Sequence, residues 1–198
     1  MNYTIIFVIG FPGSGKSTVA RSIASALGAA YLDKDIICNG FTGLLLTRNE
    51  ESADSRESSA LYKEQIMPLE YQTLFNVAND TLTSSKFVVI DAPFISFFHQ
   101  PDYLLKKCEQ YNWTDVCLQV VEVKANLEVT KQRLIQRGEK RDLWKLDNWE
   151  SFSERITRQS CHWTGVSRLS FDNSSPCADT VELINQIRQH PLKSDNKN

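Results

Sequence analysis

The strongest chemical signal in the sequence is a glycine-rich segment that ends in Lys16-Ser17. Residues 10–17 read Gly-Phe-Pro-Gly-Ser-Gly-Lys-Ser, which satisfies the pattern GxxxxGK(S/T). Glycines let successive backbone N–H groups turn inward around an anion, and a helix starting at this point adds partial positive charge. Lys16 is expected to reach the β- and γ-phosphates of a nucleotide, and Ser17 to ligate Mg²⁺. The predicted nucleotide-binding residues are Gly10, Phe11, Pro12, Gly13, Ser14, Gly15, Lys16, Ser17 and Thr18.

Three aspartates follow apolar segments that have the character of strands. Asp33 and Asp35 come just after residues 30–32, and Asp91 ends the run 87–90. Open α/β sheets bind ligands at the carboxyl ends of their strands, so Asp33 or Asp35 is expected to contact the substrate. We expect Asp35 to take the proton of an acceptor hydroxyl, although either residue could instead cap a helix. Asp91 is expected to hold Mg²⁺ or to position the substrate.

A basic segment lies in the second half of the chain. Residues 124–145 hold seven basic and three acidic side chains, although the whole protein has a formal net charge of −2. Arg133 and Arg137 are four positions apart and share one helix face, and Arg141 follows Gly138. Such a cluster suits a transferring phosphoryl group, and we expect Arg137 and Arg141 to act on it. A solvated helix end is the alternative, since cations also favour the helix dipole there.

The surrounding sequence predicts the elements that must position these side chains. Short apolar runs alternate with helical patterns, which is typical of a parallel α/β sheet. The predicted strands are 4–9, 30–32, 87–90, 116–123 and 168–171, and the first helix is 17–27. We predict a single domain over residues 1–190, with a substrate-side insert at 41–82, a lid region at 131–163 and a polar tail at 191–198.

The acceptor pocket is expected between the insert, residues 93–103 and the lid. Phe94 is predicted to contact the substrate as part of an aromatic wall after Asp91, while core packing is the alternative for such aromatic residues. Pro68 interrupts a helical pattern over 61–82, so we expect a break there around which the insert could close.

Composition narrows the class of protein. The chain has 198 residues, and its slight acidity argues against a protein that mainly coats nucleic acid or an anionic membrane. Apolar runs are far shorter than the roughly 20 residues that a spanning helix needs. The five cysteines are scattered and contain no CxxC pair, which favours reduced thiols and a cytoplasmic location. The sequence leaves monomer and homodimer open.

These motifs resemble the P-loop small-molecule kinases that act on gluconate, shikimate, chloramphenicol and nucleoside monophosphates. More closely, the chain is similar to AAA_33-type ATP-binding proteins, which include the kinase domain of polynucleotide kinase. The phosphate loop, the Leu32-Asp33-Lys34-Asp35 motif and the lid arginines carry the resemblance, and residues 171–176 match more weakly.

The resemblance implies a three-layer P-loop fold with a five-stranded parallel sheet of order 2-3-1-4-5. It also implies ATP with Mg²⁺ as the phosphoryl donor. By the same analogy Arg133 would stack on adenine, Arg137 would contact phosphate, and Ser175 and Pro176 would border the adenine pocket. One departure is that no second basic pair follows Asp35 to grip an acceptor's phosphate, and Arg48 and Arg56 are isolated among acids.

The sequence therefore favours an ATP-dependent kinase that phosphorylates a hydroxyl of a small metabolite or antibiotic-like compound. No Asn-Lys-x-Asp guanine reader follows the phosphate loop, and no glutamate lies beside Asp91 as in motor ATPases. A nucleoside or polynucleotide 5′-kinase is a second hypothesis, which the net charge disfavours. A nucleotide-dependent regulatory module with little turnover is the third.

Overall fold

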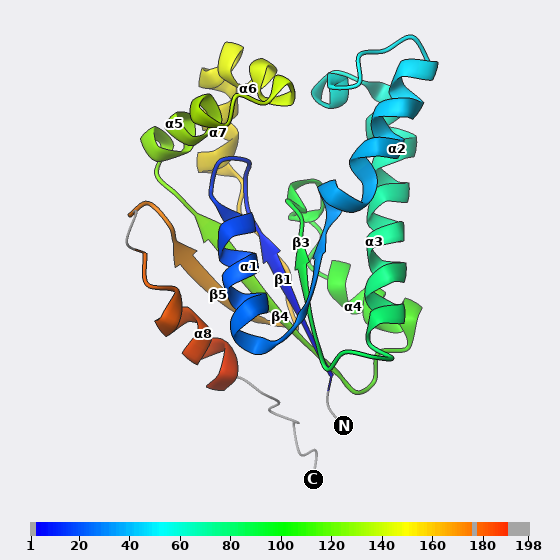
Figure 1. The fold of residues 1–198 in the computed structure, drawn as a ribbon, viewed down its shortest axis with the longest axis vertical. Coiled ribbons are helices and arrows are strands. Elements are labelled where there is room, and N and C mark those ends of the chain that lie inside the picture. Colours follow the sequence, from blue (N-terminus) through cyan, green and yellow to red (C-terminus); the bar gives the residue numbers. More distant parts are fainter. Residues whose placement is uncertain (1–2, 176–177, 190–198) are drawn as a thin grey trace.

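A central parallel sheet organises the protein. This computed structural model describes residues 3–175 and 178–189, and its five strands are arranged in the order β2-β3-β1-β4-β5, as the family resemblance implied (Figure 1). All four neighbouring strand pairs are parallel. The strands are β1 (Tyr3–Ile9), β2 (Ala30–Asp33), β3 (Phe87–Asp91), β4 (Val116–Lys124) and β5 (Ser167–Asp172).

Helices cover both faces of the sheet and bury two apolar clusters. On one face, α1 (Lys16–Leu27) and α8 (Thr180–Gln189) pack their apolar sides against β1 and β4. On the other, α3 (Met67–Thr81) and α4 (Tyr103–Tyr111) pack over a cluster rich in aromatic residues. The inner strands are apolar on both faces because each face is covered. The fold therefore has three layers.

Two helical groups project beyond the carboxyl ends of the strands (Figure 1). The insert comprises α2 (Lys34–Arg48), a 3₁₀ turn at Ser55–Glu57, a π-helical turn at Tyr62–Ile66 and the start of α3. The lid comprises α5 (Leu127–Arg137), a 3₁₀ turn at Lys140–Asp142, α6 (Leu143–Asp147) and α7 (Trp149–Arg158). A short 3₁₀ turn also occurs at Ile95–Phe97. In the described part of the chain, no helix is both long and apolar enough to span a bilayer.

The helical pattern at Pro68 is continuous, so the predicted break there is wrong. Helical structure runs from residue 60 to 81, and Pro68 lies at the first turn of α3. The backbone N–H of Met67 bonds to the carbonyl of Tyr62, five residues earlier, which is the wide spacing of a π turn. The proline follows this widened turn and lies in the first turn of α3, where its missing N–H is tolerated.

Candidate active site

The phosphate loop joins β1 to α1 and is held in place by hydrogen bonds from two other parts of the chain. Gly15 precedes α1 with φ 85°, and a Cβ there would lie 2.3 Å from Asn173 Nδ2, so only glycine fits. The Ser14 carbonyl accepts hydrogen bonds from Asn173 Nδ2 at 2.9 Å and from Arg133 at 3.0 Å. Arg133 also donates to the Asn173 carbonyl at 2.8 Å. The lid helix α5 and the turn after β5 therefore hold the loop in position.

Asp91 and Ser17 form an oxygen-rich corner beside this loop. Asp91 ends β3 and is 2% exposed; its Oδ2 accepts a hydrogen bond from the Tyr31 hydroxyl at 2.7 Å. Burial raises the pKa of Asp91, while the Lys16 charge and hydrogen bonds from Ser17 and Tyr31 oppose that rise. Its other oxygen, Oδ1, is buried and has no hydrogen-bond partner in the described residues.

This corner fits Mg²⁺. The described residues contain no group of three or more His, Cys, Asp or Glu side chains arranged to hold a metal. Mg²⁺ does not need such a cage, because it keeps several waters and uses one or two protein ligands together with phosphate oxygens. Ser17 and Asp91 could supply those ligands, and the ion would neutralise charge on the phosphates.

Lys16 lies at the start of α1, where the charges of three carboxylates, Asp91, Asp35 and Asp33, act on it. Burial lowers the pKa of the Lys16 ammonium, and the negative charges of Asp91 and Asp35 counteract that effect. A partly desolvated ammonium interacts with phosphate oxygens more strongly than a hydrated one does. Lys16 therefore interacts electrostatically both with Asp91 of the metal corner and with Asp35 of the insert.

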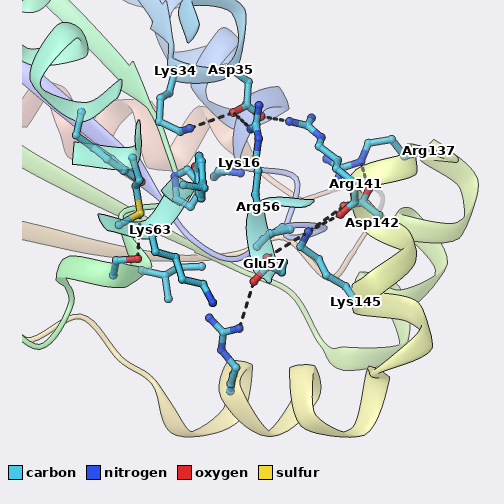
Figure 2. Close-up of a pocket in the computed structure, with 18 residues that line it drawn as sticks. Lys16, Lys34, Asp35, Arg56, Glu57, Lys63, Arg137, Arg141, Asp142 and Lys145 are labelled. Atoms are coloured by element: carbon cyan, nitrogen blue, oxygen red, sulfur yellow. Dashed lines mark hydrogen bonds and ion pairs between the residues drawn. The ribbon is translucent and has the colours of Figure 1, made fainter. Parts of the chain in front are cut away.

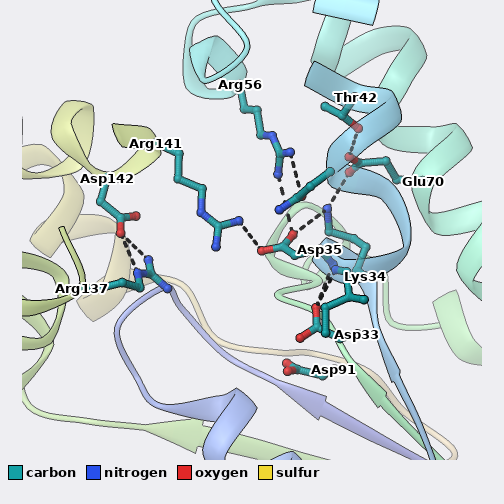
Figure 3. Close-up of polar contacts among 12 residues, drawn as sticks. Asp33, Lys34, Asp35, Thr42, Arg56, Glu70, Asp91, Arg137, Arg141 and Asp142 are labelled. Atoms are coloured by element: carbon teal, nitrogen blue, oxygen red, sulfur yellow. Dashed lines mark hydrogen bonds and ion pairs between the residues drawn. The ribbon is translucent and has the colours of Figure 1, made fainter. Parts of the chain in front are cut away.

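Asp35 lies in the first turn of α2 and is surrounded by cations (Figure 3). Arg141 of the lid donates to its Oδ2, and Lys34 Nζ and an Arg56 nitrogen lie 3.4 and 3.7 Å from its Oδ1. Burial raises the pKa of Asp35, but the charges of Lys34, Arg141 and Lys16 outweigh it and hold the pKa well below its usual range. Asp35 is therefore an ionised hydrogen-bond acceptor.

A buried network beneath Asp35 fixes the start of α2. Lys34 Nζ lies 2.6 Å from Glu70 Oε2, and both side chains are nearly inaccessible. The hydroxyls of Tyr62 and Thr42 also donate to the Glu70 carboxylate, at 2.9 and 2.5 Å. A buried ion pair is favourable only when further hydrogen bonds satisfy its atoms, as they do here. Glu70 neutralises Lys34 and ties α2 to α3.

One cavity brings these groups together (Figure 2). It has a volume of about 530 Å³ and lies between the phosphate loop, the insert, the loop after β3 and the lid. This size suits a small-molecule ligand. Eight cationic and three anionic side chains line it: Lys16, Lys34, Arg56, Lys63, Arg137, Arg141, Lys145 and Arg155 with Asp35, Glu57 and Asp142.

Ion pairs cross the cavity from the lid to the insert. Arg141 reaches Asp35, while Lys145 Nζ and an Arg155 nitrogen lie 3.4 and 3.5 Å from the two carboxylate oxygens of Glu57. Lys145 also donates to the Arg141 carbonyl at 2.9 Å. The lid is therefore held over the insert by side-chain charges.

Comparison with known proteins places the chain in a family. A family model described as an AAA domain, AAA_33, matches residues 5–158. The chain belongs to the AAA_33 family. Among curated relatives, shikimate kinase from Chlorobium luteolum is 37% identical over 78 residues, which is 39% of this chain and 35% of the relative. Shikimate kinase from Mycobacterium avium is 37% identical over 59 residues, 30% of this chain and 34% of the relative. The matches thus span about a third of the curated relatives.

Solved structures share the fold of this AAA_33 protein along nearly its whole length. A protein from Chloroflexus aurantiacus gives a TM-score of 0.67 at 17% identity, covering 97% of this chain and 100% of that one. A sugar kinase from Janibacter sp. gives 0.61 at 14% identity, covering 96% and 94%. A gluconokinase from Sinorhizobium meliloti gives 0.51 at 15% identity, covering 93% and 89%. These similarities show a P-loop kinase fold.

The structure of the AAA_33 chain gathers the four predicted catalytic side chains, Lys16, Asp35, Arg137 and Arg141, around one cavity. Arg137 donates two hydrogen bonds to Asp142 Oδ2, at 2.8 and 2.5 Å, and so is held within the lid (Figure 3). Arg133 is bonded to the loop carbonyl, and stacking on adenine stays a prediction. Ser175 is exposed, while Pro176 lies outside the described residues.

Two predicted substrate residues have other surroundings. Asp33 caps α2, because its carboxylate accepts from the backbone N–H groups of Asp35 and Ile36 at 2.9 and 3.2 Å. That is the alternative the sequence left open. Phe94 is fully buried, with φ 56° turning its ring into the core against Phe7 and Tyr71. The predicted substrate contact of Phe94 is therefore wrong in this structure, because the ring does not line the cavity.

Several residues of the site were not predicted from the sequence. Glu57 lies in a serine-rich loop without a motif, and Lys145 and Arg155 lie on lid helices beyond the predicted arginines. Asn173 falls in the turn that the family resemblance covered, but its bond to the loop had no signal of its own. The strong amphipathic pattern of α7, with Phe152 buried, could have placed Arg155 on the side facing the cavity.

Proposed function

We propose that the protein is an ATP-dependent kinase that transfers the γ-phosphoryl group to a hydroxyl of a small molecule. The observation that carries the proposal is the convergence of Lys16, Asp35 and the lid arginines on one cavity beside the Ser17–Asp91 corner. The kinase fold and the family support it. The names of the curated relatives, shikimate kinases, support a small-molecule acceptor. A cytoplasmic setting fits this chemistry.

Each group has a part in the transfer. The acceptor oxygen forms a bond to the γ-phosphorus while the bond from that phosphorus to the β–γ bridging oxygen breaks, releasing ADP. Asp35 accepts a hydrogen bond from the acceptor hydroxyl and takes its proton as the transfer completes. Lys16 stabilises the β- and γ-phosphate oxygens, and Arg137 and Arg141 close over them from the lid. A magnesium ion at Ser17 and Asp91 would supply further neutralisation of phosphate charge.

The cationic partners of Asp35 fit this assignment. A carboxylate whose pKa is held low is a weak base in the resting protein. In a loose transition state the hydroxyl proton leaves late, so orientation of the nucleophile matters more than basicity. When Arg141 moves to the phosphates, Asp35 loses one positive neighbour and its proton affinity increases.

The direct test is ADP release from ATP·Mg²⁺ in the presence of pooled hydroxyl compounds, nucleosides and oligonucleotides. We expect a small-molecule pool to stimulate release, with γ-phosphate recovered on the compound. Lys16→Ala is expected to lower turnover by about 10³-fold or more, since it removes a preorganised charge at the transferring group. Circular dichroism and thermal unfolding serve as the fold control. Stimulation by oligonucleotides alone would favour a polynucleotide kinase, and tight ATP binding without stimulation would favour a regulatory module.

A further inference from the structure

The wall of the cavity built by the insert and the lid carries more positive charge than the donor needs. It contributes four cations outside the arginines proposed for phosphate: Arg56, Lys63, Lys145 and Arg155. Glu57, from the 3₁₀ turn of the insert, pairs with Lys145 and Arg155. In addition, Lys145 Nζ lies 3.5 Å from Asp142 Oδ1, and an Arg56 nitrogen lies 3.7 Å from Asp35 Oδ1. A cavity wall with more cations than carboxylates favours an anionic occupant.

The other four cations of the cavity have shorter ion pairs or a role with the phosphate donor. Glu70 neutralises Lys34, Asp142 holds Arg137, and Asp35 pairs with Arg141. Lys16 belongs to the phosphate loop. These pairings account for the positive charge near the loop and leave the excess at the insert and lid.

Glu57 is a loose counter-ion for this wall (Figure 2). Its two oxygens lie 3.4 Å from Lys145 Nζ and 3.5 Å from an Arg155 nitrogen, with the Glu57 side chain 28% exposed. Charge-assisted hydrogen bonds are usually 2.7–2.9 Å long, so these contacts are ion pairs without close hydrogen bonding. Lys63 Nζ has no hydrogen bond or ion pair anywhere in residues 3–175 and 178–189. Both observations leave room for a second anion.

We propose that the phosphoryl acceptor carries an anionic group, a carboxylate or a phosphate, that replaces Glu57 between Lys145 and Arg155. Lys63 stands beside this position on the insert, and the acceptor hydroxyl lies at Asp35. This inference rests on the proposed kinase function and names the class of its acceptor. Glu57 fills the subsite with its own carboxylate when no acceptor is bound.

The arrangement also solves an electrostatic problem of such a reaction. An anionic acceptor and a triphosphate repel each other when they approach in a cavity of low dielectric. Cations on the acceptor side offset that repulsion, and they form closer hydrogen bonds with a free oxyanion than with the tethered Glu57 carboxylate. A neutral polyol has no group that can displace Glu57, so it is expected to bind weakly.

Matched pairs of compounds that differ in one anionic group test the class directly. ADP release from ATP·Mg²⁺ is measured with D-gluconate and sorbitol, glycerate and glycerol, shikimate and its methyl ester, and glucose 6-phosphate and glucose. We expect at least one anion to be phosphorylated with kcat/KM about tenfold or more above its neutral partner, the factor for one charged hydrogen bond. Carboxylates and phosphates in the set distinguish the two sources of the oxyanion.

The outcomes separate this inference from the proposed function. Phosphorylation of neutral compounds at rates equal to or above those of their acids would overturn the anionic acceptor while leaving the kinase intact. No stimulation by any compound would count against the kinase itself and against this inference with it.

Variants of the wall test the named residues. Arg155→Met is expected to raise the KM for the anionic acceptor about 10- to 100-fold. Lys63→Met is expected to raise it about threefold, and neither variant should change the KM for ATP much. Arg158→Met is the matched control, because Arg158 lies on the same helix but pairs with Glu154 at 3.7 Å and is absent from the cavity lining.

Glu57→Gln gives an effect of opposite sign. Removing the tethered carboxylate should lower the KM for the anionic acceptor severalfold, since the acceptor no longer competes with it. If Glu57 only held the lid closed, the same variant would raise the KM values for ATP and acceptor together. That result would overturn the placement of the anion between Lys145 and Arg155.

Discussion

The two halves of the active site are built by different physical means. The donor half, which comprises the phosphate loop with Ser17, Asp91, Arg133 and Asn173, lies on buried strand ends and is held by short hydrogen bonds to backbone carbonyls. The acceptor half, which comprises the insert and lid walls of the cavity, is held mainly by ion pairs between side chains. The donor half is therefore preformed by the fold.

The acceptor half depends on charge balance. Its cross-cavity pairs at Glu57 are 3.4–3.5 Å long and involve side chains that are 28% and 41% exposed at Glu57 and Arg155. The Glu57–Arg155 pair joins partly exposed side chains, so it is weak and is screened by salt. The Lys145 side chain is 7% exposed, so its pair with Glu57 is screened less. A site built in this way can open, exchange one anion for another and close again. The comparison predicts that substitutions in the two halves will separate turnover, stability and affinity.

Among substitutions in the acceptor half, Asp35→Asn is expected to cause the largest loss of activity. It removes the ionised acceptor for the hydroxyl proton, so kcat should fall about 10²- to 10³-fold, within the usual range for loss of a general base. ATP affinity should be kept, because the donor half does not use this carboxylate. Steady-state kinetics and ATP titration measure the two effects separately.

The pH dependence of this loss sharpens the assignment. The folded-state pKa of Asp35 is held below its usual value, so the carboxylate stays ionised above that range. The ratio of wild-type to Asp35→Asn turnover should therefore be constant between about pH 6 and pH 8. Asp80→Asn, an exposed aspartate on α3, is the matched control. If Asp35→Asn kept the wild-type kcat, Asp35 would have no part in the chemical step.

The donor half could be predicted from sequence because its chemistry is local. The spacing of glycines before Lys16-Ser17 determines a backbone shape, and apolar strands buried on both faces are readable as continuous runs. Strand order, in contrast, came from the family resemblance. Asp91 was found because it ends such a strand.

The acceptor half could not be predicted in the same way. Its contacts join residues far apart in the chain, such as Asp35 and Arg141, which are separated by 106 positions. No local pattern indicates that Glu57 faces Lys145 and Arg155. The direction of Phe94 was equally hidden, because a positive φ after the strand turns the ring toward the core. Side-chain partners between separate elements are a property of the tertiary structure.

Asp91→Asn tests the donor half through stability. Burial raises the folded-state pKa of Asp91, so the folded protein binds this proton more tightly than the unfolded chain does. The contribution of the group to stability is full below the ordinary pKa and is lost as pH rises through the folded pKa. Without ligands, Asn should increase the free energy of unfolding by about 1 kcal/mol at pH 7, and by less at pH 4.

The same variant should lose function. Wild-type protein is expected to gain thermal stability from ATP with Mg²⁺, and Asp91→Asn should gain markedly less because one metal ligand is weakened. Denaturant unfolding at both pH values and thermal unfolding with ATP, with and without Mg²⁺, provide the measurements. Equal stabilisation of the two proteins by Mg²⁺ would exclude Asp91 from the metal corner.

Asp33 gives the smallest expected effect, and it lies at the boundary between the two halves. Its carboxylate caps α2, and its Oδ2 lies 3.0 Å from the Tyr31 hydroxyl, whose single proton it shares with the nearer Asp91 Oδ2 at 2.7 Å. Asp33→Ala should cost about 0.5–2 kcal/mol of stability, the usual value for a lost cap, whereas Asp33→Asn keeps most of the capping. Chemical unfolding measures the loss. If the residue only positions α2, kcat for Asp33→Asn stays within about threefold of wild type, because Asp35 keeps its place. A loss as large as that of Asp35→Asn would instead mean that both aspartates contact the substrate, and that the acceptor half extends to the strand end itself.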